Sequence, residues 1–229
     1  MVYGMNVQEM NCEKLFNLFC LYGNVEKIKF LKSKEGSAMV QMADAESVER
    51  IITSLNRMVI FGYPLQLGFS KQTMLHEMKT PFELSDGTLS FKDFSCSRNN
   101  RFSNTDMASK NRSNRHLTGP PTDVLHYFNA PPGLSDADIY DLFDPNYRPN
   151  NVTIFPPKSK FKNFSLNFKQ LFYSFPPLLL FNQTGERSSS GLLFYQNAQL
   201  ATEALIRYNH LQIDNQGDLL SNNFNFFLN

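Results

Sequence analysis

The sequence predicts an α+β protein built from two β-α-β-β-α-β units, each with a four-stranded antiparallel sheet. At 229 residues the chain has room for two domains of ordinary size, and its 41% hydrophobic content supports packed cores. A turn led by glycine runs into alternating residues at 34–42, and a similar stretch recurs at 187–195. Each copy is preceded by a helix and a strand and followed by a helix, so we expect one unit used twice.

The first unit is predicted to cover residues 1–75. A strand at 1–5 begins abruptly, which suggests a fragment or a truncated gene model. Asn11 and Asp44 are placed to cap two helices, because short polar side chains can accept hydrogen bonds from the first free backbone N–H groups. Two further strands are expected at 25–31 and 65–69.

Alternation along the central strands separates two faces of this sheet. The core-facing residues are expected to be Ile28, Phe30, Ala38, Val40 and Met42. The outer face is expected to carry Lys27, Lys29, Leu31, Ser37, Met39 and Gln41.

Residues 76–121 form a connection much longer than ordinary loops. It is basic and contains too many aromatic residues for a free linker. We therefore predict a linker docked on a domain surface through Phe91, Phe94 and Phe102, with a short helix at 105–112. A disordered basic tether is the alternative.

The second unit is predicted at 122–229, with strands at 124–129 and 151–155 and a helix at 198–209. Ser135 and Asp138 have the spacing of a capping box before another helix. The closing strand is not evident, because residues 219–228 are apolar without a clear period.

One stretch, 161–184, does not fit the second unit. It contains six phenylalanines between 161 and 181 and no acidic residue. We interpret it as a retained intron or a gene-model error, and the tail after Gly217 as a second candidate error. The alternative is a genuine loop that binds a partner through its rings. With no clear hydrophobic period, the stretch is expected to be disordered or loosely packed.

Composition excludes several functions. A net charge of +1 gives no general attraction to nucleic acid, so any such partner needs a local patch. The four histidines are scattered, and the three cysteines show no metal-ligand spacing. We therefore expect no enzyme, metal or cofactor. The longest uncharged apolar run, 171–181, is too short to span a bilayer, and no membrane partner is expected.

The unit resembles the RNA recognition motif, a ferredoxin-like fold in which outward aromatic residues on the two central strands stack RNA bases. The third-strand octets here are Glu-Gly-Ser-Ala-Met-Val-Gln-Met at 35–42 and Ser-Ser-Ser-Gly-Leu-Leu-Phe-Tyr at 188–195. The usual aromatic positions fall on Ser37, Met39, Ser190 and Leu192, so most of the stacking power is gone there.

Non-aromatic octets with a long docked linker resemble one group of this family, that of polypyrimidine-tract-binding protein and heterogeneous nuclear ribonucleoprotein L. The stretches that carry the resemblance lie at 17–27, 91–95, 97–102, 124–131 and 186–193. The resemblance implies the C-terminal pair of motifs of such a protein. It further implies binding of CA-rich single-stranded RNA, regulation of alternative splicing, and a nuclear location with the cytoplasm left open as a second compartment.

By position, the resemblance implies RNA contacts from both sheets. Those in the first unit are Tyr3, Lys29, Leu31, Met39, Ser70, Lys71 and Gln72. Those in the second unit are His126, Phe128, Ser190 and Leu192. Aromatic rings and the imidazole are suited to stacking, and lysines to phosphates. The alternative is a scaffold that uses degenerate motifs to bind peptides of other splicing factors.

Overall fold

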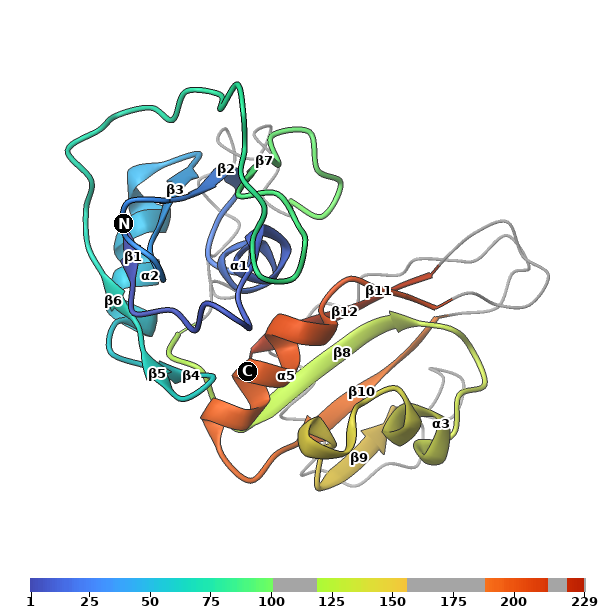
Figure 1. Ribbon diagram of the computed structural model, residues 1–229. Coiled ribbons are helices and arrows are strands. Elements are labelled where there is room, and N and C mark those ends of the chain that lie inside the picture. The colour runs from blue at the N-terminus through green and yellow to red at the C-terminus, as the bar shows by residue number, and fades with distance from the viewer. Residues whose placement is uncertain (101–118, 156–187, 214–221, 229) are drawn as a thin grey trace.

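The computed structural model describes residues 1–100, 119–155, 188–213 and 222–228, and Figure 1 shows two antiparallel sheets in it. The first sheet has the strand order β6-β1-β3-β2-β7, and the second has the order β11-β12-β8-β10-β9. The predicted α+β fold with two sheet-and-helix units is therefore confirmed, but each of these two sheets has five strands where four were expected. The predicted helix at 105–112, Phe102 and the stretch 161–184 lie outside the described residues.

The first unit follows the predicted order of elements. Its helices are α1 (Cys12–Phe19) and α2 (Ala45–Leu55). Its strands are β1 (Val2–Tyr3), β2 (Val25–Phe30), β3 (Ala38–Met42), β4 (Val59–Ile60), β5 (Tyr63–Pro64) and β6 (Gln66–Leu67). Both caps form as expected, since Asn11 accepts from the Lys14 N–H at 2.8 Å and Asp44 accepts from the Ser47 N–H at 2.6 Å.

The linker contributes a strand to the first sheet. Strand β7 (Phe91–Asp93) pairs with the outer edge of β2. Just after it, Phe94 turns under the sheet, where its ring stacks on Phe16 of α1 at 4.3 Å between centroids. Phe94 is buried, so this part of the linker belongs to the core of the first unit.

The second unit repeats the plan with longer strands. Its helices are α3 (Asp136–Asp141), the 3-10 helix η3 (Pro145–Tyr147) and α5 (Ala198–Tyr208). Its strands are β8 (Val124–Ala130), β9 (Asn151–Ile154), β10 (Ser189–Phe194), β11 (Leu211–Ile213) and β12 (Asn222–Leu228). The capping box of Ser135 and Asp138 forms at the start of α3, as predicted.

Within the tail after Gly217, residues 222–228 form a strand of the second sheet. Strand β12 lies between β11 and β8 and pairs with β8 from Leu125 to Phe128. The side chain of Phe226 is fully buried in the core. Residues 225–228 thus cover one edge of β8, which favours the tail as a genuine part of the second unit over the candidate gene-model error.

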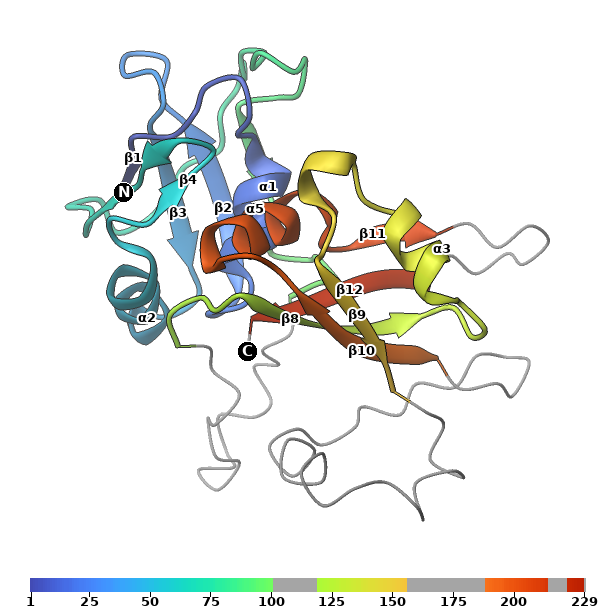
Figure 2. The same ribbon diagram turned by 90° about the horizontal axis from the view of Figure 1, so that it is seen from below.

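The two units meet through their helices. Helix α1 packs against α5, and both lie between the two sheets (Figure 2). Asn17 in α1 donates to the carbonyl of Ile206 at 3.0 Å, and Asn209 donates to the carbonyl of Asn17 at 3.0 Å. The buried carboxylate of Glu203 accepts from the backbone N–H of Phe61 at 2.7 Å. Because the helices face inward, each sheet has its other face turned away from the partner unit.

Candidate nucleic-acid interface

The outer face of the first sheet carries a row of three side chains. Lys29 on β2 lies directly opposite Met39 on β3 and, on its other side, opposite Phe91 on β7. Cross-strand partners share a face, so the lysine is flanked by a thioether and an aromatic ring. All three side chains are half-buried. This arrangement offers an apolar platform for a base beside a cation for a phosphate.

The other residues predicted on this face differ in how far their side chains are exposed to solvent. Tyr3 is half-buried, and the ammonium of Lys34 lies 4.2 Å from the centre of its ring. Leu31 is half-buried at the end of β2. Ser37 is only 2% exposed, so it does not offer the open surface that an outward position was expected to give. Its carbonyl accepts from the Leu31 N–H at 3.0 Å, which closes the β2–β3 turn and removes Ser37 from the open surface.

The segment after β6 crosses toward the same face. Ser70, Lys71 and Gln72 are all exposed, and the Gln72 N–H donates to the Ser70 hydroxyl at 3.0 Å. Farther along, the Leu75 N–H donates to the side-chain oxygen of Gln41 on β3 at 2.7 Å. Leu75 is 5% exposed, so this segment covers part of the outer face next to the lysine row.

The outer face of the second sheet carries an aromatic cluster. The ring of His126 on β8 lies 6.2 Å from that of Phe128 and 5.7 Å from that of Phe155, which follows β9. Burial lowers the pKa of His126 from its ordinary value of 6.5 to about 4. The imidazole is thus neutral at physiological pH, and it can stack on a base but supplies no charge to a phosphate.

Leu192 and Ser190 on β10 complete this face. Leu192 lies directly opposite His126, on the predicted face, but it is only 4% exposed. A side chain this buried offers little surface to a base, and the RNA contact of Leu192 stays a prediction. Ser190 is half-buried at a register shift of β10, and its carbonyl accepts from the Phe155 N–H at 2.8 Å.

Sequence reasoning missed one residue of the cluster and assigned another to a different role. Phe155 ends the predicted strand 151–155, where the alternation gave no sign that its ring would reach His126. Phe91 was predicted as a docking residue, but its register against Lys29 puts it on the outer face. The signal that could have found Phe91 is its position three residues before the buried Phe94, on the opposite side of a strand.

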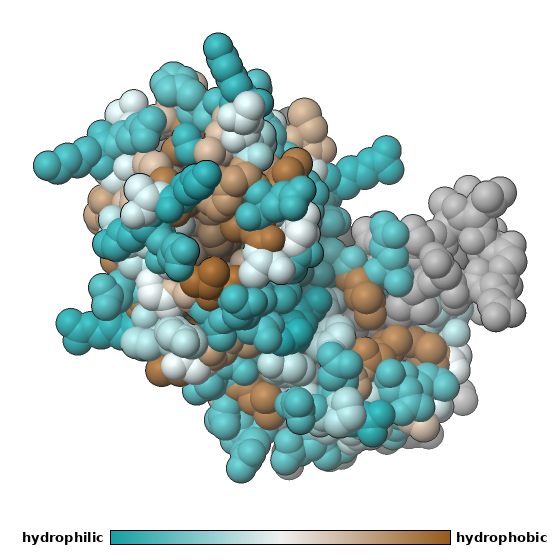
Figure 3. Space-filling model, in the orientation of Figure 1, coloured by the Kyte–Doolittle hydropathy of each residue, from teal (hydrophilic) through white to brown (hydrophobic). Residues whose placement is uncertain are grey.

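The part of the chain that the structure describes shows neither a metal site nor a membrane-spanning helix. It contains no group of three or more histidine, cysteine or acidic residues that could hold a metal ion. Nor is any of its helices long and apolar enough to cross a membrane. The surface seen in Figure 3 is mostly hydrophilic over both units, with separate hydrophobic patches.

Comparisons with known proteins agree with this geometry. The family model described as "RNA recognition motif (a.k.a. RRM, RBD, or RNP domain)" matches residues 1–97. A second model, described as "RRM domain", matches residues 110–171 and 167–228. The first match includes β7 and Phe94, and the second reaches through β12.

Curated relatives in this family resemble nearly the whole of this chain. Heterogeneous nuclear ribonucleoprotein L from Homo sapiens, Mus musculus and Rattus norvegicus is 42% identical over 217 residues in each case. These matches cover 94% of this chain and 30–32% of the relatives, so the chain spans about a third of their length.

Among solved structures, a complex of Sxl-lethal protein with RNA covers 100% of this chain and 96% of its own, at 13% identity and a TM-score of 0.28. The family assignment therefore rests on the sequence matches. Together with the two sheets they show that this chain, a homologue of heterogeneous nuclear ribonucleoprotein L, belongs to the non-enzymatic, RNA-binding RNA recognition motif family.

Proposed function

We propose that this chain binds single-stranded RNA selectively, with a preference for CA-rich pre-mRNA, and thereby regulates alternative splicing in the nucleus. The observation that carries the proposal is that each outer face combines a base-sized apolar platform with polar groups. In the first unit Lys29 stands between Met39 and Phe91. In the second unit the neutral His126 stands between Phe128 and Phe155.

The two faces are suited to different parts of the RNA. The first face has cations beside its platform, Lys29 in the row and the exposed Lys71 at the strand exit, so it can hold phosphates. The second face offers rings and an uncharged imidazole, so its binding energy comes from stacking and base-edge hydrogen bonds. Selectivity for sequence belongs mainly to the second face, because phosphate contacts carry no sequence information.

The experiment is a fluorescence-anisotropy titration of the full chain with a CA-repeat oligonucleotide and with a scrambled oligonucleotide of the same composition. Each titration is done at two salt concentrations. We expect tighter binding of the CA repeat, with an affinity that falls as salt rises. Equal affinity for both oligonucleotides would contradict sequence selectivity, and binding of neither would contradict RNA binding by these faces.

A scaffold function is the second candidate, with peptides of other splicing factors as ligands. The observation that favours it is the loss of the usual stacking positions, since Ser37 and Leu192 are both non-aromatic and buried. It predicts that peptides, but neither oligonucleotide, bind with micromolar affinity.

A further inference from the structure

A second row of side chains lies on the outer face of the first sheet, beside the row that contains Lys29. In this second row Lys27 on β2 lies opposite Gln41 on β3 and, on its other side, opposite Asp93 on β7. Residues two apart on a strand share a face, so Asp93 lies on the same face as Phe91. The row therefore ends in a carboxylate on the strand that the linker adds to the sheet.

The carboxylate of Asp93 is held in place by its neighbours. Its Oδ1 accepts from the backbone N–H of Ser95 at 2.8 Å and from the Ser95 hydroxyl at 2.6 Å. Its Oδ2 lies 3.7 Å from the ammonium of Lys27. The Ser95 hydroxyl, the Ser95 N–H and Lys27 hold the pKa of Asp93 below its ordinary value, so the group is ionised at physiological pH. In that state it accepts hydrogen bonds and cannot donate one.

This carboxylate keeps the capacity to accept from a ligand. The side chain of Asp93 is 37% exposed. An ionised carboxylate has about four lone-pair sites, and the contacts with Ser95 and Lys27 account for about three of them. A donor that approaches from solvent can therefore bond to Asp93 without displacing its present partners.

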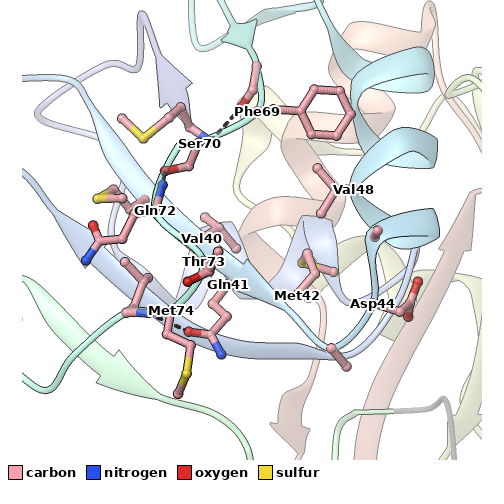
Figure 4. Close-up of a pocket in the computed structure, with 16 residues that line it drawn as sticks. Val40, Gln41, Met42, Asp44, Val48, Phe69, Ser70, Gln72, Thr73 and Met74 are labelled. Carbon is pink, nitrogen blue, oxygen red and sulfur yellow. Dashed lines mark hydrogen bonds between the residues drawn. The ribbon is translucent and has the colours of Figure 1, made fainter.

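The amide at the other end of the row is already engaged. The Nε2 of Gln41 donates to the carboxylate of Glu26, and its Oε1 accepts from the Leu75 N–H at 2.7 Å (Figure 4). Turning the amide over to suit a different ligand would break both contacts. Asp93 is therefore the better placed of the two to contact a base.

The spacing along β7 brings Asp93 within reach of a base stacked on Phe91. Residues two apart on a strand are separated by ~6.6 Å. The exocyclic groups of a base project beyond its ring, and a hydrogen bond spans a further ~2.9 Å. A base that lies over the ring of Phe91 can thus direct an exocyclic group at the carboxylate.

The chemistry of an acceptor divides the four bases into two pairs. Cytosine and adenine carry an exocyclic amino group, which donates hydrogen bonds, where uracil and guanine carry a carbonyl oxygen, which accepts them. Single-stranded RNA exposes these groups on its Watson–Crick edges. An ionised carboxylate attracts the first pair and repels the second.

We propose that Asp93 is a specificity-determining residue that selects bases with an exocyclic amino group, cytosine or adenine, over uracil and guanine. The proposal rests on the proposed RNA-binding function and gives its CA preference a chemical basis in the first unit. It adds a group that reads bases to a face whose lysines contact phosphates, which carry no sequence information. Lys27 and Lys29 offset the negative charge of Asp93, so the carboxylate does not make this face repel RNA.

The test uses the full chain and three labelled RNA octamers in fluorescence-anisotropy titrations at one salt concentration. The first is a CA repeat, the second has uracil for every cytosine, and the third has hypoxanthine for every adenine. Each replacement exchanges the amino group for a carbonyl oxygen. We expect at least one replacement to weaken wild-type binding by about tenfold or more, and the replacement that does so identifies the base that Asp93 contacts.

Asp93→Asn is the matched variant. The asparagine oxygen can still accept from Ser95, while its NH₂ group can donate to a base carbonyl, so the fold is kept and the selectivity is not. We expect an unchanged urea midpoint and a ratio of affinities, CA repeat over replaced RNA, that falls by about threefold or more. Glu77→Gln removes an exposed carboxylate elsewhere on the linker and should keep the wild-type ratio.

The same ratio in Asp93→Asn and in the wild type would overturn the proposal and leave RNA binding intact. An equal change in affinity for all three RNAs would make Asp93 a turn or charge residue, and would overturn it too. So would a wild-type chain that prefers the CA repeat to a scrambled RNA but tolerates both replacements. Binding of none of the three RNAs would overturn the proposed function together with this proposal.

Discussion

At the scale of single residues, the two outer faces should respond differently to substitution. Phe128→Ala removes a ring of the second cluster, and we expect it to weaken RNA binding by about 1–3 kcal/mol with little change in salt dependence. Lys71→Ala removes an exposed cation, so it should weaken binding and flatten the plot of log affinity against log salt.

Anisotropy titrations of both variants at several salt concentrations test this pair of expectations. Lys79→Ala is a suitable control, because Lys79 is also exposed on the linker but is not one of the predicted contacts. Variants that all bind like the wild type would show that the sheet faces are not the RNA surface.

The buried imidazole of His126 should make the second unit less stable in mild acid. Its folded pKa is about 4, below the value of about 6.5 that an unfolded chain has. Above pH 6.5 the proton makes no difference, because both states are neutral. As pH falls from 6.5 to 4, the unfolded state binds the proton first, and stability should fall by up to about 3 kcal/mol.

Urea unfolding at pH 7 and pH 5 measures this loss. The His126→Phe variant keeps a ring in the cluster but cannot be protonated, so its stability should change less between the two pH values. An equal pH dependence in the variant and the wild type would assign the effect to other groups.

At the scale of elements, patterns within one helix or strand were the most predictable. Asn11, Asp44 and Ser135 each cap the helix that sequence spacing indicated. Residues whose neighbours come from distant segments were not predictable. Strand β12 has a poor alternation, and its place is set by pairing with β11 and β8. Leu192 lies on the predicted face but is buried there. Alternation gives the face of a side chain but not what covers it.

The linker segment 91–94, strand β7 and the residue after it, contributes both to stability and to the candidate interface. Phe94 is buried in the core against Phe16, whereas Phe91 is half-buried on the outer face beside Lys29. We expect Phe94→Ala to destabilise the first unit by about 3–5 kcal/mol, because it leaves a cavity under the sheet. Phe91→Ala should cost about 1 kcal/mol or less in stability but should weaken RNA binding by a comparable or larger amount.

Chemical denaturation and RNA titration of both variants separate the two roles. A large loss of stability in Phe91→Ala would show that its ring is a core residue. Unchanged stability in Phe94→Ala would show that the linker does not hold the sheet in the way the stacked rings indicate.

At the scale of the whole molecule, the interface between α1 and α5 combines buried hydrogen bonds with charge. Glu203 is 8% exposed and accepts from the Phe61 N–H, while Arg207 pairs with Glu9 and lies 5.1 Å from the ring centre of Phe61. These contacts use both units, and neither residue could find the same partners in one unit alone. The interface holds the two outer faces apart, so under the proposed function an RNA strand that binds both must loop around the pair.

We therefore expect the two units to tumble as one body in solution. The double variant Glu203→Ala/Arg207→Ala removes both charged contacts. It leaves the buried Phe61 N–H without its acceptor, which should destabilise the interface by about 1–3 kcal/mol, and it also removes the ion pair with Glu9. NMR relaxation should give one correlation time for both units in the wild type and shorter, separate times in the double variant. Glu49→Ala, which changes an exposed acidic residue of α2, serves as the control and should behave like the wild type. Independent correlation times in the wild-type chain would show that the helix contacts do not hold the units together.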